Sequence, residues 1–223
     1  MPRKKKKLEG ERLFFAVATV FALVLGTGLF FLLYALNQRE KTPIFTPETD
    51  GAAAIAPDHP RQLVDFSLTD RTGRTVTQAD LADKFLVVDF LFTSCSLTCP
   101  VVNQRMAEIQ RLTAAQPDVK LVSITVDPRD DTVDTLAKYG ARFGADTNRW
   151  LLLTGDRDGL YHLIGGSFLA QDASDSFNYM PGNFTHTERI AVVDNRGHVR
   201  AYFDGLNDGV AQAVVDQIAR LRN

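Results

Sequence analysis

The sequence contains few of the residues that bind metals or form disulfides. Its 223 residues include two cysteines, four histidines and three methionines. A closed structural zinc site uses four Cys or His ligands. Beyond the two cysteines and His186, no fourth Cys or His is evident for such a site. Internal repeats and low-complexity tracts are also absent from the sequence. At this length we expect one globular domain with appendages.

The main body of the chain lacks an excess of positive charge. Residues 1–41 hold eight Lys/Arg and three Asp/Glu, which leaves 17 and 24 of the chain's 25 and 27 for residues 42–223, a net charge of −7. Proteins that bind nucleic acid present a basic surface. The acidic body therefore argues against nucleic acid as a partner.

A single long apolar run lies near the N-terminus, at residues 13–36, and contains no charge. As a helix it would span roughly 36 Å, enough to cross a bilayer. The apolar core of a cleaved signal peptide is only ~7–15 residues long and is followed by a small-residue cleavage site, which this sequence lacks. We therefore predict a transmembrane anchor at 13–36, after a cytoplasmic basic segment at 1–12.

The segment after the apolar run shows no periodicity and contains several prolines, so residues 37–60 are predicted to be a flexible tether. No cysteine follows the run that could carry a lipoprotein anchor, and no Arg/Ser-rich, acid-poor transit peptide precedes it. We expect a single-pass protein of a bacterial inner membrane, with residues 61–223 as a periplasmic domain.

Strand and helix patterns alternate in residues 61–223. Strands are expected at 66–70, 74–77, 85–92, 119–126, 150–153, 189–194 and 198–203, and helices at 100–115, 132–143, 159–164 and 209–221, with a loop at 165–183. Two strand–helix repeats followed by a hairpin and a closing helix are typical of a thioredoxin-like α/β fold.

Both cysteines follow the apolar strand at 85–92, in the run Cys95-Ser96-Leu97-Thr98-Cys99-Pro100. Because proline favours the first helical position, Cys95 is predicted in the strand-to-helix turn and Cys99 at the helix N-terminus. The helix dipole stabilises a thiolate there. Such a pair can form a disulfide or hold a soft metal ion between its sulfurs.

A purely structural disulfide would contribute little here, because closing a five-residue loop yields at best about 2 kcal/mol. The motif also differs from other thiol chemistries. Thioredoxin-type oxidoreductases use Cys-x2-Cys, commonly with Trp where this chain has Ser94, and a cis-proline directly before the facing strand; the nearest proline is Pro181. The Pro-x3-Thr-x2-Cys pattern of thiol peroxidases is also absent.

His186 lies just before the strand at 189–194. In a thioredoxin-like fold the start of that strand lies beside the cysteine turn, so His186 is expected to reach the sulfurs. Two thiolates and one imidazole suit Cu(I), and hold Cu(II) with a further donor. Met180 could add a thioether, although packing within its loop is the simpler reading. His59, His162 and His198 are interpreted as solvated or packed side chains.

Three motifs resemble the Sco/SenC family: Cys95 to Pro100, Asp127-Pro128 with Asp131-Thr132, and His186-Thr187. The sequence differs from the family pattern in having Thr185 in place of the usual Asp before the histidine, and in an arginine, Arg129, displaced by one residue.

The resemblance implies a membrane-anchored, thioredoxin-like copper protein that binds copper through Cys95, Cys99 and His186. It also implies a role in assembling the binuclear copper centre of cytochrome c oxidase subunit II, or in serving another extracytoplasmic cuproprotein, and not a turnover enzyme. The alternatives are a thiol–disulfide oxidoreductase that keeps partner cysteines reduced through Cys95 and Cys99, and a redox-inert docking domain.

Overall fold

The computed structural model describes residues 61–168 and 188–222. The predicted anchor at 13–36, the flanking segments 1–12 and 37–60, Met180 and His186 lie outside the described residues. Within the described part, no helix has the length and apolar character needed to cross a bilayer.

A mixed seven-stranded sheet forms the centre of the domain, in the order β2-β1-β5-β4-β3-β6-β7. Strands β3, β4 and β5 are parallel, whereas β6 pairs antiparallel with β3, and β1 pairs antiparallel with β5. The strands are β1 (Ser67–Asp70), β2 (Thr75–Thr77), β3 (Phe85–Leu91), β4 (Val119–Thr125), β5 (Trp150–Thr154), β6 (Arg189–Val193) and β7 (Val199–Asp204).

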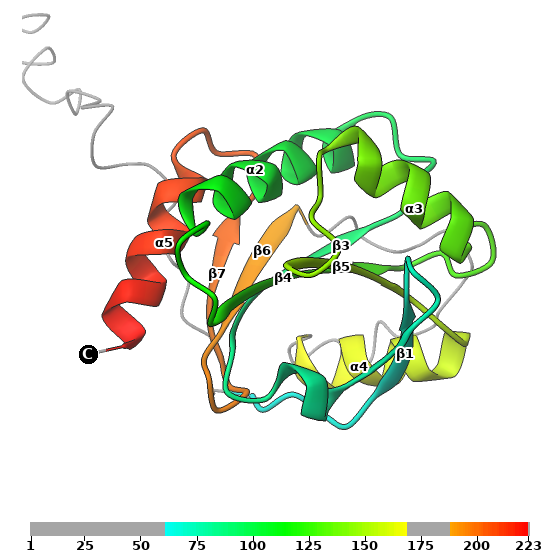
Figure 1. Cartoon of the computed structure of the whole chain (residues 1–223), viewed down its shortest axis with the longest axis horizontal. Helices are drawn as coiled ribbons and strands as arrows, with labels where there is room; N and C mark the ends of the chain where they lie inside the picture. Colours follow the sequence, from blue (N-terminus) through cyan, green and yellow to red (C-terminus); the bar gives the residue numbers. More distant parts are fainter. Residues whose placement is uncertain (1–60, 169–187, 223) are drawn as a thin grey trace, which may run out of the picture. The chain divides into compact units, whose positions relative to one another are not determined.

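Helices cover both faces of the sheet, with α2, α3 and α5 on one face and α4 on the other (Figure 1). The helices are η1 (Gln78–Leu81), α2 (Thr98–Leu112), α3 (Val133–Arg142), α4 (Arg157–Ser167) and α5 (Val210–Leu221). This arrangement confirms the predicted thioredoxin-like α/β fold.

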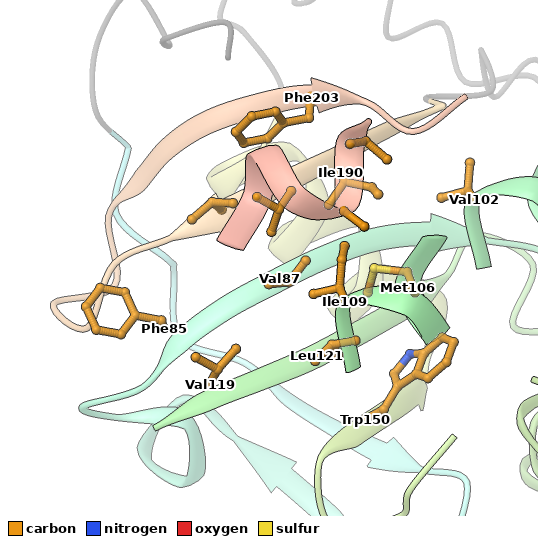
Figure 2. Close-up of a cluster of buried hydrophobic side chains, with 14 of the residues drawn as sticks. Phe85, Val87, Val102, Met106, Ile109, Val119, Leu121, Trp150, Ile190 and Phe203 are labelled. Carbon is orange, nitrogen blue, oxygen red and sulfur yellow. The ribbon is translucent and has the colours of Figure 1, made fainter. Parts of the chain in front are cut away.

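Alternation along β3 explains why the domain has two apolar layers. Val87 and Leu91 face α2 and α5, whereas Leu86 and Val88 face α4. Figure 2 shows the first layer, in which Ile109 of α2 is fully buried. Replacing a buried aliphatic side chain of this size by Ala costs about 2–5 kcal/mol, so this layer fixes α2, and with it the helix start that carries Cys99, onto the sheet.

Most predicted elements are confirmed with shifts of one or two residues, and two boundaries are informative. Helix α2 begins at Thr98, not at Pro100. Pro100 fits within its first turn because the first four N–H groups of a helix have no intrahelical acceptor. Helix α4 extends to Ser167, so the predicted loop start at residue 165 is wrong. Gly166, within this last turn, packs closely on Val64, where a Cβ would approach within 2.8 Å.

Candidate redox and metal centre

The loop between β3 and α2, residues 92–97 (the redox loop), carries the first cysteine. The backbone N–H of Cys95 donates to the carbonyl of Phe92 over 3.1 Å, which closes a tight turn. Cys99 lies in the first turn of α2 with 7% of its surface exposed, whereas Cys95 is half-buried. Both cysteines are free thiols, so the structure represents the reduced form of the pair.

The environment of Cys95 favours its thiolate. Partial burial raises the pKa of Cys95, but hydrogen bonds from the backbone N–H groups of Cys99 and Leu97 and from the Cys99 thiol outweigh burial and lower it to about 7. These donors belong to the start of α2, where N–H groups lack intrahelical acceptors. About half of the Cys95 thiols are therefore ionised at neutral pH.

Cys99 has the opposite character, so the expectation that the helix start stabilises its thiolate is wrong. Burial raises the pKa of Cys99 to about 12 against a hydrogen bond from the backbone of Phe92, and the Cys95 sulfur and the Asp89 carboxyl make smaller contributions that raise it further. The pair therefore combines an accessible nucleophile with a buried thiol that keeps its proton. This division of roles suits thiol–disulfide exchange.

A buried polar cluster lies behind Cys99. The Asn103 amide donates to the carbonyl of Cys99 over 2.9 Å and to Asp89 over 3.4 Å. The hydroxyl of Ser123 donates to the other oxygen of Asp89, and the indole N–H of Trp150 donates to Ser123 over 2.8 Å. Complete burial raises the pKa of Asp89 to about 7, against the hydrogen bond from Ser123.

Two further polar atoms in this region lack partners among the described residues: the hydroxyl of Tyr139 and Oδ1 of Asn103. Burial raises the pKa of Tyr139, and the nearby Asp89 and Cys99 raise it further. No motif in the sequence predicted this cluster. The available signal was Asp89 itself, a single carboxylate within an otherwise apolar strand.

The stretch from Asp127 to Thr132 follows the end of β4 and leads into the N-cap of α3. The Thr132 hydroxyl accepts from the N–H of Thr135 at the start of α3. The carboxylate of Asp131 accepts hydrogen bonds from Thr93 in the redox loop, a contact that the sequence did not predict.

The structure does not describe His186, but it describes Glu188, two residues later. The carbonyl of Glu188 accepts from the N–H of Gly205 over 2.6 Å. A Cβ on Gly205 would lie 2.6 Å from that carbonyl oxygen and 3.0 Å from the side chain of Val102. Because Val102 follows Cys99 by three residues on α2, the chain enters β6 beside the helix start that carries Cys99.

The other histidines of the described domain lie elsewhere. His162 is exposed on α4, across the sheet from α2. His198 lies beside Asp194 in the turn between β6 and β7. This turn adjoins the beginning of β3, the end opposite the redox loop. Residues 61–168 and 188–222 contain no cluster of three or more His, Cys, Asp or Glu side chains able to hold a metal ion.

Comparison with known proteins relates this domain to one family. The SCO1/SenC family model matches residues 56–223. The SCO1 protein homolog of Bacillus subtilis (strain 168) is 32% identical over 91 residues, which cover 40% of this chain and 47% of that protein. The match thus spans about half the length of this curated relative.

Two solved structures share the fold. BsSco, a member of the Sco family of cytochrome c oxidase assembly proteins in which a disulfide switch has been identified, superposes with a TM-score of 0.62 at 22% identity, covering 74% of this chain and 96% of BsSco. Copper-bound ScoI of Bradyrhizobium japonicum superposes with a TM-score of 0.55 at 24% identity, covering 70% of this chain and 99% of ScoI. With the family model matching the whole described domain, including the loop that holds both cysteines, the chain belongs to the SCO1/SenC family.

Proposed function

We propose that this protein is a membrane-anchored copper-binding protein that delivers copper to, or helps assemble, the binuclear copper centre of cytochrome c oxidase subunit II. The observation that carries the proposal is the pair of free thiols formed by Cys95 in the redox loop and Cys99 in the first turn of α2. Paired thiolates are soft ligands that select Cu(I). Copper is thus the cargo, with another extracytoplasmic cuproprotein as the alternative recipient.

The two thiols would contribute differently to copper uptake. A cysteine binds metal as the thiolate, so metal binding displaces any proton that the sulfur still carries. Cys95, with a pKa of about 7, is already half ionised at neutral pH, whereas Cys99, with a pKa of about 12, must lose its proton. Cys95 is therefore the first ligand to engage copper, and deprotonation of Cys99 completes the dithiolate.

His186 is the proposed third ligand. Glu188 is held beside the start of α2 through Gly205, as described above. Because two residues of extended chain span at most about 7 Å, the described position of Glu188 is compatible with His186 as a ligand beside that helix start. An imidazole added to two thiolates gives a trigonal set suited to Cu(I), which with one further donor also holds Cu(II).

The proposed location rests on the sequence. Residues 13–36 would anchor the protein once in a bacterial inner membrane, with residues 1–12 in the cytoplasm, and residues 37–60 would tether the domain in the periplasm. The reduced state of a recipient's copper ligands matters in that compartment, because disulfides persist there.

A second function, reduction of a partner's disulfide, is favoured by the asymmetry of the pair. The Cys95 thiolate would attack a partner disulfide to form a mixed disulfide and release one partner thiol. Cys99 would then attack Cys95, releasing the second partner thiol and leaving the Cys95–Cys99 disulfide. This chemistry needs both cysteines but not His186.

The stoichiometry of copper binding tests the proposal. The full chain in detergent is reduced, loaded anaerobically with Cu(I) and desalted, and copper per chain is measured for the wild type, Cys95→Ser and Cys99→Ser. We expect about one copper in the wild type and much less in either variant, because the dithiolate is the soft part of the site. Equal copper in all three proteins would contradict the proposal.

A further inference from the structure

Asp131 is a buried carboxylate whose hydrogen-bond donors come from two other segments. Its side chain is 1% exposed. The backbone N–H of Thr93 donates to both carboxylate oxygens, over 3.1 and 3.2 Å, and the Thr93 hydroxyl donates to one of them. The hydroxyl of Thr125, the last residue of β4, donates to the other oxygen. Three donor groups therefore converge on this carboxylate.

These bonds join the redox loop to the end of the neighbouring strand. Thr93 lies two residues before Cys95, and the Cys95 N–H closes its turn on Phe92, on the other side of Thr93. Thr125 is fixed in turn, because its hydroxyl accepts from the N–H of Asp127 over 2.9 Å. The redox loop is thus attached at Thr93 to a rigid part of the sheet.

Holding these two segments together does not by itself explain why the residue at position 131 is a carboxylate. Asp131 does not cap α3, since Thr132 does, and it makes no ion pair with a cation of the described residues. A buried carboxylate without a counter-charge costs stability. What it gains is several acceptor positions, which bind both the N–H and the hydroxyl of Thr93 in one geometry.

We propose that Asp131 is a positioning residue for Cys95: by fixing Thr93, it holds the redox loop so that the Cys95 sulfur faces the N–H groups at the start of α2. The inference concerns the thiols alone and does not depend on copper as the cargo. Without the carboxylate, Thr93 and the turn after it lose their attachment. The Cys95 sulfur then spends less time against its N–H donors.

The reactivity of Cys95 in the reduced, metal-free full chain tests this role. The rate of alkylation of Cys95 by iodoacetamide at pH 7 is measured by peptide mass spectrometry. We expect Asp131→Ala to lower this rate about tenfold, because the Cys95 sulfur is then no longer held against the N–H donors at the start of α2. Asp130→Ala is the matched control, because Asp130 is an exposed neighbour; its rate should equal that of the wild type.

Variants of Thr93 test the same contact from the other side. Thr93→Ser keeps the hydroxyl and is expected to react within twofold of the wild type, whereas Thr93→Val removes it and is expected to react severalfold more slowly. This pair decides the question if Asp131→Ala does not fold. A Cys95 rate within twofold of the wild type in folded Asp131→Ala, or equal rates in Thr93→Ser and Thr93→Val, would overturn the proposal. Because no metal is present, neither outcome depends on copper binding.

Discussion

The thiol of Cys99 donates a hydrogen bond to the sulfur of Cys95. Backbone N–H groups at the start of α2 donate to the same sulfur, and together these bonds lower the pKa of Cys95 against its partial burial. Burial is the main cause of the raised pKa of Cys99, to which the contact with Cys95 and the nearby Asp89 add. The result is a pair with pKa values of about 7 and about 12, formed by two residues of the same type, one in the redox loop and one in the first turn of α2.

Alkylation at neutral pH should therefore select Cys95. In the reduced protein at pH 7, we expect iodoacetamide to modify Cys95 at least about a hundredfold faster than Cys99, because only the thiolate reacts and Cys99 is also buried. Peptide mass spectrometry over time gives both rates. In urea, where the domain unfolds, the alkylation rates of Cys95 and Cys99 should become similar. Equal rates in the folded protein would show that this difference in acidity is absent.

Asp89→Asn should stabilise the domain in a pH-dependent way. The pKa of Asp89 is raised to about 7 by burial, so the folded state holds this proton up to about pH 7 and the unfolded state only to about pH 4. As pH rises from 4 to 7, the wild type loses free energy of unfolding, and above pH 7 it carries the full cost of the buried charge. We expect Asn to relieve about 4 kcal/mol at pH 8, from about three pKa units at about 1.4 kcal/mol each, and little at pH 4.

Urea unfolding of the wild type and Asp89→Asn at pH 4, 6 and 8 measures this difference. Asp130→Ala serves as a control, since the carboxylate of Asp130 is exposed. The difference between its free energy of unfolding and that of the wild type should not grow from pH 4 to pH 8 as it does for Asp89→Asn. If the difference in free energy of unfolding between Asp89→Asn and the wild type is constant at all three pH values, the raised pKa of Asp89 is contradicted.

Gly205→Ala should disturb the contact between β6 and α2. The new Cβ would lie 2.6 Å from the carbonyl oxygen of Glu188, so the backbone must shift, at a cost of about 1–3 kcal/mol. Because this shift moves the start of β6 away from Val102, we also expect less copper per chain. Urea unfolding and copper analysis measure the two effects.

Gly144→Ala is the matched control for that variant. Gly144 has φ of 64° with no atom near its Cβ position, so Ala there costs about 1 kcal/mol of backbone strain without touching the cysteine centre. It should retain copper as the wild type does. Equal copper loss in both variants would show that general destabilisation, and not the contact at Glu188, is responsible.

The fold was predictable because its signals are local. Apolar runs such as the one in β3, and helical spacing such as that in α3, are read from neighbouring residues. The ends of α2 and α4 were less predictable, because they depend on contacts with distant residues. The close packing of Gly166 on Val64 joins segments about a hundred residues apart, and no local pattern encodes it.

Parts of the centre were equally hard to predict. The cysteine spacing pointed to paired thiols at a helix start, which is where the structure places them. The lowered pKa of Cys95 arises from hydrogen-bond donors around the start of α2, and the raised pKa of Cys99 arises mainly from burial. Both are properties of the packed domain. The bond between Asp131 and Thr93 joins residues 38 positions apart. It exists because β3 and β4 are parallel neighbours that end side by side.

Copper retention by His186→Ala tests the central claim, a three-ligand copper site, most directly. The reduced full chain in detergent is loaded anaerobically with Cu(I) and desalted, and copper per chain is measured for the wild type, His186→Ala and His162→Ala, the last an exposed histidine on α4. The account predicts about one copper in the wild type and in His162→Ala and much less in His186→Ala, since only His186 completes the ligand set. Undiminished copper in His186→Ala would contradict the three-ligand site. Negligible copper in all three proteins, with reduction of a disulfide substrate intact, would leave the oxidoreductase as the function.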